Sequence, residues 1–193
     1  MAKKDNLIDF LDTVFVVDGE MIKDNGEDSY AYSVNEQYGL IGVFDGCGGI
    51  GSRKYDVYSN KTGAFISSHT IAKTISEWFD RFSENDNDLS GDNVKVICSE
   101  LEEVFTEELR KLESGAAKTM IKGSLTKSFP TPASFILFQK RDRGLYTSFV
   151  WAGDSRGFIL NSTGLAQITQ DDIDEGEDAL SILSNDSRLT NVV

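Results

Sequence analysis

Acidic residues stand at three places where runs of apolar residues meet polar ones. The pair Glu27-Asp28 precedes the run SYAYSV, Asp45 follows YGLIGVF, and Asp154 follows FVWAG. Hard divalent cations prefer carboxylate and carbonyl oxygens as ligands. Glu27 and Asp45 lie on neighbouring expected strands and could face one cation, joined by the carbonyl of Gly46, where no Cβ blocks the turn. Acids are also common where strands meet loops, so an ordinary solvated surface stays an equal alternative.

Other catalytic chemistries have little support. The sole histidine, His69, lies inside an expected helix, and a Ser-His-Asp or Cys-His mechanism would depend on it alone. No Walker lysine follows the glycine-dense stretch 46–51. An EF-hand loop beginning at Asp171 would place isoleucine at its third and twelfth positions, where ligand oxygens are needed. Cys47, among the glycines, is either a reactive thiol or a small filler.

Composition limits the class of protein. The 193 residues are 39% hydrophobic, which is enough for one domain with a real core. With 19 basic and 32 acidic residues the net charge is −13. Such a surface repels nucleic-acid backbones and anionic membranes and attracts divalent cations and basic partners. We see no apolar signal region, no run near the ~20 residues of a membrane helix and no cysteine framework, so we expect a cytoplasmic protein.

Hydrophobic periodicity predicts the strands and helices on which these acids lie. Alternating and β-branched runs predict strands, whereas apolar residues three and four apart predict amphipathic helices. The first half reads as strands at 13–20, 30–34 and 38–44, then helices at 65–82 and 94–112. The second half reads as an antiparallel meander of strands at 133–140, 145–153, 156–161 and 165–169, and a short helix at 178–183. This order is typical of an α+β fold with antiparallel sheet and segregated helices.

Four ordered stretches tie the acids together: NGEDSY, VFDGCGG, PTPASFILF and FVWAGDSRGFIL…GLAQITQDD. They resemble, over nearly all of residues 13–172, the sequence blocks of the metal-dependent serine/threonine protein phosphatases, the type 2C family. The resemblance implies a fold of two packed antiparallel β-sheets flanked by helices. It also implies that residues 1–193 form a single domain that lacks the C-terminal part of the family's domain.

The resemblance further implies a centre of two or three Mn²⁺ or Mg²⁺ ions. Asp45 would bridge two ions, and the Gly46 carbonyl and Glu27 would bind one of them. Asp28 would support these ligands without binding an ion directly, and Asp154 would help to hold a further, weaker ion. The implied activity is hydrolysis of phosphoserine and phosphothreonine in a protein substrate by a metal-activated water.

Three departures from the family pattern matter. Cys47 replaces a histidine proposed to protonate the leaving alkoxide, and a thiol of pKa near ~8.5 can donate a proton. Lys23 is the nearest counterpart of a phosphate-gripping arginine; it lacks the bidentate fork, and a plain surface lysine is the alternative. The chain stops at Val193 before the family's later DG…D and DN blocks, whose aspartates complete the metal pair. We therefore expect a shortened chain with weak metal binding, reduced activity, and self-association through an incomplete sheet.

Three interpretations stay open. The chain is a phosphatase with impaired activity, a non-catalytic module of the same fold that binds a phosphoprotein or another partner, or an unrelated acidic cation-binding domain. The ordered motif blocks favour the first.

Overall fold

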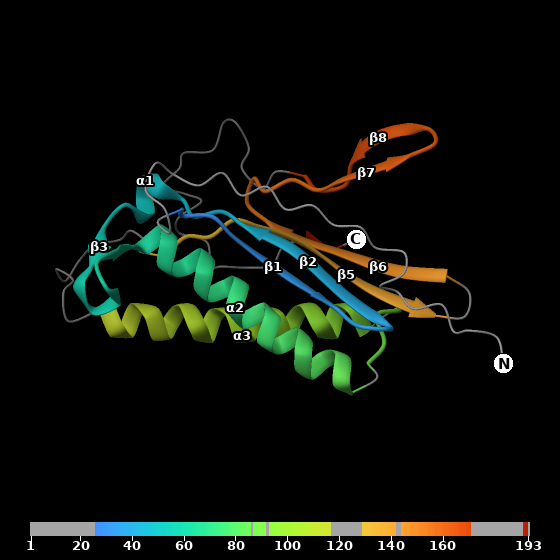
Figure 1. The fold of residues 1–193 in the computed structure, drawn as a ribbon, viewed down its shortest axis with the longest axis horizontal. Coiled ribbons are helices and arrows are strands. Elements are labelled where there is room, and N and C mark those ends of the chain that lie inside the picture. Colours follow the sequence, from blue (N-terminus) through green and yellow to red (C-terminus); the bar gives the residue numbers. More distant parts are fainter. Residues whose placement is uncertain are drawn as a thin grey trace.

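The computed structural model describes residues 26–85, 87–91, 93–116, 129–141, 144–170 and 191–192. Two long helices lie against one face of an antiparallel sheet, and a short hairpin projects on the other side (Figure 1). The elements are β1 (Ser29–Val34), β2 (Tyr38–Phe44), α1 (Gly48–Gly51), β3 (Lys54–Tyr55), a 3₁₀ turn (Asp56–Tyr58), β4 (Lys61–Thr62), α2 (Gly63–Glu84), α3 (Asn93–Ala116), β5 (Ala133–Arg141), β6 (Gly144–Ala152), β7 (Phe158–Asn161), β8 (Gly164–Gln167) and β9 (Asn191–Val192).

The main sheet has the order β1-β2-β5-β6-β9, and each neighbouring pair is antiparallel. Its register aligns one row of residues across four strands: Ser29 pairs with Phe44, Phe44 with Ala133, and Ala133 with Ala152. Because neighbouring strands run in opposite directions, the start of β1, the end of β2, the start of β5 and the end of β6 share one edge. This register decides which loops meet.

The core lies between the sheet and the helices. Leu40, Phe44 and Leu137 point to the helical side from alternate strand positions and are fully buried. Ile75 and Trp78 of α2 meet them from the apolar stripe that predicted this helix. Thr62 begins α2 by accepting a hydrogen bond from the backbone N–H of Phe65, at 3.2 Å.

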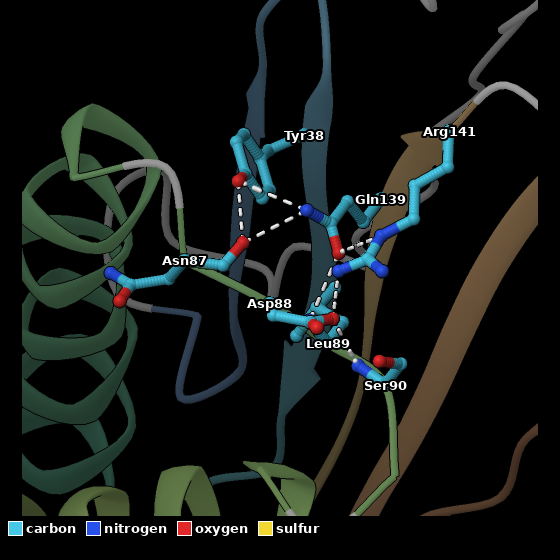
Figure 2. A network of polar contacts seen from close by, with 7 residues as sticks. All are labelled: Tyr38, Asn87, Asp88, Leu89, Ser90, Gln139 and Arg141. Atoms are coloured by element: carbon cyan, nitrogen blue, oxygen red, sulfur yellow. Dashed lines mark hydrogen bonds and ion pairs between the residues drawn. The ribbon is translucent and has the colours of Figure 1, made fainter.

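A polar network fixes the opposite end of the sheet to the connection between α2 and α3 (Figure 2). Gln139, which is 2% exposed, donates from Nε2 to the Tyr38 hydroxyl at 3.0 Å and to the Asn87 carbonyl at 2.8 Å. Its Oε1 accepts from the Leu89 N–H at 2.9 Å and from Nε of Arg141 at 3.1 Å. All four bonds of the buried amide are made, which is what a buried polar group needs.

The α+β class with antiparallel sheet is confirmed, as are the strands that became β1, β2 and β5–β8 and the helices that became α2 and α3. Of the two packed sheets expected, the described residues build one five-stranded sheet and two separate two-stranded pairs. The strand expected at 13–20, the helix at 178–183 and Lys23 lie outside the described residues.

The predicted four-stranded meander is wrong at one step, because β7 does not continue the sheet from β6. Gly153 turns the chain away with a φ of +77°, and β7 pairs only with β8. Hydrogen bonds close the base of this hairpin on itself, from Ile168 N to the Gly157 carbonyl at 2.8 Å and from Gly157 N to Thr169 Oγ1 at 2.8 Å. β9 pairs with Val150 and Trp151 at the edge of β6.

Large apolar side chains remain exposed on the hairpin and on the sheet face away from the helices. Leu160 and Leu165 of the hairpin are 77% and 66% exposed, and Tyr30 and Val43 of the sheet are about half exposed. Within the described part of the chain, no helix is long and apolar enough to cross a membrane. The self-association expected from the sequence stays a prediction.

Candidate metal centre

The acids singled out in the sequence meet at the edge that the register creates. Asp28 precedes β1, Asp45 follows β2, and Asp154 lies two residues beyond β6. The N–H of Asp45 donates to the carbonyl of Pro132 at 2.9 Å, which extends the ladder between β2 and β5 by one residue. Gly153 passes so close to Pro132 that a Cβ at position 153 would come within 3.0 Å of the Pro132 Cβ. These two contacts keep Asp45 and Asp154 on the same corner of the sheet.

The Asp28 side chain contacts the turn after β2. Its Oδ1 accepts a hydrogen bond from the Gly46 N–H at 3.1 Å. The supporting role that the resemblance implies for Asp28 stays a prediction, and this contact is the observation that motivates it.

The pKa of Asp45 is raised above its ordinary value of 3.8. Partial burial of the carboxyl is the largest cause, followed by the charges of Asp28 and Asp154, the hydrogen bond with Asp28, and the charge of Glu27. These three acids therefore lie close enough to Asp45 to disfavour its charged form, and a divalent cation beside Asp45 would relieve this repulsion.

Glu27 is held against the glycine turn. Its Oε1 accepts a hydrogen bond from Thr62 Oγ1 at 2.5 Å, and its backbone carbonyl accepts one from Ser68 Oγ. A Cβ on Gly48 would lie 2.6 Å from Glu27 Oε2, and one on Gly46 would lie within 2.8 Å of the carbonyl carbon and the Cβ of Glu27. Gly46 is thus required by the close approach of the Glu27 main chain, a reason that the sequence did not reveal, whereas a side chain at Gly48 would have to displace the Glu27 carboxylate.

The donor set suits a hard cation in chemical kind, because it consists of carboxylate and carbonyl oxygens. Among the residues that the structure describes, however, no three His, Cys, Asp or Glu side chains converge in a way that could hold a metal ion. Asp28 and Asp154 lie close enough to Asp45 to raise its pKa, but the three carboxylates do not form a complete coordination sphere. The expectation that the 193 residues bind metal weakly stays a prediction.

Cys47 differs from its sequence-based expectation. Burial, and then the charges of Asp45, Asp154 and Asp28, raises the pKa of its thiol to about 11, well above the ~8.5 of a free cysteine. A half-buried thiol beside carboxylates resists ionisation, and the role of Cys47 as an acid stays a prediction. At neutral pH Cys47 keeps its proton.

His69 is half-buried on α2 and stacks on its own helix. Its ring stacks on Phe65 with 3.8 Å between the ring centroids, and its Nδ1 lies 2.8 Å from the Phe65 carbonyl. Burial is the main cause of a lowered pKa, which keeps this imidazole neutral at pH 7. Thr62 and Ser68 are the contacts that sequence reasoning missed, although a threonine directly before an amphipathic run is a helix-cap signal.

No protein-family model and no curated protein matches this chain. Among solved structures it is similar to the serine/threonine phosphatase PstP/Ppp of Mycobacterium tuberculosis, with 18% identity and a TM-score of 0.45 over 79% of this chain and 51% of that one. The chain is also similar to the serine/threonine phosphatase Stp1 from Staphylococcus aureus, with 16% identity and a TM-score of 0.49 over 80% of this chain and 51% of that one.

A third similar structure is the catalytic domain of the serine/threonine protein phosphatase PstP in complex with two manganese ions. It has 17% identity and a TM-score of 0.44, over 80% of this chain and 53% of that one. The chain thus spans about half the length of the structures it matches.

Proposed function

We propose that this chain carries the acidic, metal-binding part of a type 2C protein phosphatase. Its acidic edge would bind Mn²⁺ or Mg²⁺, and its substrates would be phosphoserine and phosphothreonine in proteins. The observation that supports this proposal is the gathering of acids around the turn after β2. Asp28 accepts a hydrogen bond from the Gly46 N–H, and Glu27 lies against Gly46. The charges of Asp28, Asp154 and Glu27 all raise the pKa of Asp45. These four acids come from three motif blocks, NGEDSY, VFDGCGG and the block that contains GDSR.

Each residue has a role in the proposal. Asp45, the Gly46 carbonyl and Glu27 would hold the cations, and Asp154 would help to hold a further ion. Asp28 orients the turn through its bond to the Gly46 N–H. The bound cations would lower the pKa of a water and neutralise phosphoryl oxygens.

Two further residues would handle substrate and product. Cys47 is a protonated neighbour of Asp45 at neutral pH and could give its proton to the leaving group, although burial makes it a weak acid. Lys23 would attract the phosphate as a point charge, without a bidentate fork.

The test is a titration of Mn²⁺ into the 193-residue chain, followed by release of the bound metal into EDTA. Asp45→Asn removes the proposed bridging carboxylate, and Glu103→Gln removes one exposed carboxylate from α3 as a matched control. We expect weak Mn²⁺ binding and slow hydrolysis of p-nitrophenyl phosphate, both lost in Asp45→Asn and kept in Glu103→Gln. Equal Mn²⁺ binding by the two variants would rule out the proposed site.

A non-catalytic binding module is the second candidate. It is favoured by the lack of three convergent ligand side chains in the described residues. A phosphoserine peptide that binds, needs Asp45 and is never hydrolysed in saturating Mn²⁺ would support this alternative over the enzyme.

A further inference from the structure

We infer that Thr62 and Ser68 are positioning residues for metal binding, because they fix Glu27 against the glycine turn from the start of α2. The inference rests on the proposed function, in which Glu27 is a ligand of the cation. Neither residue belongs to the motif blocks of the acidic edge.

The Thr62 hydroxyl makes two hydrogen bonds of defined direction. It accepts one from the backbone N–H of Phe65 at 3.2 Å, which caps α2. Its own proton is then free to go to Glu27 Oε1, 2.5 Å away. Because the hydroxyl proton points at Oε1, this contact selects one orientation of the Glu27 side chain.

The main chain of Glu27 is held from the same helix. Ser68 lies on the sheet-facing side of α2 with 0% exposure, and its Oγ donates to the Glu27 carbonyl. The second carboxylate oxygen, Oε2, lies against Gly48, where a side-chain Cβ would come within 2.6 Å. Oε1 therefore faces the helix and Oε2 faces the glycine turn beside Asp45, which leaves Oε2 as the oxygen for a cation.

The short strand pair β3–β4 holds Thr62 in place. β3 and β4 pair Lys54 with Thr62, and the Gly63 N–H donates to the Arg53 carbonyl at 2.8 Å. Tyr55 of β3 is 1% exposed and packs on Phe129 with ring centroids 5.1 Å apart.

The packing around Tyr55 extends to α3. Tyr55 belongs to a small core with Leu112 and Ala116 of that helix. A ligand held by packed second partners loses less freedom when it binds a metal, and removal of such partners typically weakens metal affinity 10–100-fold.

The experiment compares Thr62→Val with Thr62→Ser in the full 193-residue chain. Valine removes the hydroxyl and keeps the shape, whereas serine keeps both hydrogen bonds. We measure Mn²⁺ affinity from the electron paramagnetic resonance of free Mn²⁺, and melting in EDTA to record the effect of the lost helix cap. Thr62→Val should weaken Mn²⁺ binding on the order of 10-fold, while Thr62→Ser stays within about 2-fold of the parent.

A double-mutant cycle with Glu27→Gln separates positioning from general stability. If Thr62 acts through Glu27, Thr62→Val has little further effect on Mn²⁺ affinity once Glu27 is replaced. Equal losses in both backgrounds would overturn the inference. Should Thr62→Val fail to fold, Ser68→Ala carries the same cycle, because it leaves the cap of α2 in place.

The results also distinguish this inference from the proposed function. Mn²⁺ binding that requires Asp45 but is unchanged in Thr62→Val and Ser68→Ala overturns the inference alone. Mn²⁺ binding that is independent of Asp45, or absent at millimolar Mn²⁺, overturns the proposed site and the inference with it.

Discussion

The Asp28 carboxylate accepts a hydrogen bond from the backbone N–H of Gly46, with 3.1 Å between Oδ1 and N. This contact joins the residue before β1 to the turn after β2. The Asp28 carboxylate binds the N–H of Gly46, so the carbonyl oxygen of Gly46 is left for another partner. A turn braced in this way can present Asp45 without a ligand already in place, although the crowded carboxylates then repel one another.

Replacing Asp45 by asparagine should stabilise the metal-free protein. Burial, and then the charge of Asp28, raises the pKa of Asp45 above 3.8, so the folded chain favours the neutral carboxyl. The ionised form therefore destabilises the fold once the pH exceeds the raised pKa, and this penalty disappears below pH 3.8. We expect Asp45→Asn to melt on the order of 1–2 °C higher than the parent at pH 7.

Calorimetry in EDTA checks this prediction, with scans at about every half pH unit between about pH 3.5 and 8. The difference between parent and Asp45→Asn should shrink as the pH falls through the raised pKa toward the ordinary value. Glu103→Gln, which removes an exposed acid on α3, should show no comparable trend. A lower melting temperature for Asp45→Asn at pH 7 would contradict the crowding of these acids.

Alkylation of Cys47 should be slow at neutral pH. Its thiol pKa of about 11 leaves very little thiolate, so iodoacetamide should react on the order of 100-fold more slowly than with an unperturbed thiol. Cys98 also has a pKa of about 11, and Cys98→Ser isolates the signal of Cys47. Mass spectrometry of the metal-free protein should show a rate that still rises between about pH 8 and 10. A plateau reached near neutral pH would mean that the thiol is not buried among carboxylates.

Gly46→Ala should disrupt the acidic edge. The new Cβ would lie within 2.8 Å of the backbone carbon and the Cβ of Glu27, which cannot move without shifting the loop. We expect a loss of about 2–4 kcal/mol in the free energy of unfolding and loss of Mn²⁺ binding. Gly49→Ala is the matched control, because its Cβ would meet no atom within 4 Å. Urea unfolding of both variants measures the difference, and equal stabilities would refute the close approach of Glu27.

Gln139→Leu should destabilise the fold without changing the acidic edge. It removes the acceptor of the Leu89 N–H and one of the two donors to the Asn87 carbonyl, which keeps its bond from the Tyr38 hydroxyl (Figure 2). Loss of a buried, fully bonded amide should cost about 2–3 kcal/mol. Gln167→Leu, at an exposed position on β8, should cost little. Mn²⁺ affinity should match that of the parent in both folded variants, and an affinity change in Gln139→Leu would show that the two ends of the sheet are coupled.

Much of the fold could be predicted from local pattern. Alternation in YAYSV and the three-and-four spacing from Phe65 to Phe82 reflect burial on one face, which depends mainly on near neighbours in the chain. For the same reason the acids at strand ends could be recognised as a group once the strands were placed. The strands β7 and β8 were predicted, but their departure from the main sheet was not, because it depends on one backbone turn at Gly153 and on competition for the edge of β6.

The sequence by itself determined which residues are acidic, which segments form strands and helices, and that a flexible bend follows Asp45. Only the tertiary structure decided which of these residues touch. Thr62 on Glu27, Asp28 on Gly46 and the raised pKa values of Asp45 and Cys47 all depend on strand register and helix docking. The physical reason is that hydrogen bonds and electrostatic repulsion act over a few ångströms in space, whereas sequence periodicity reports only which side of an element is buried.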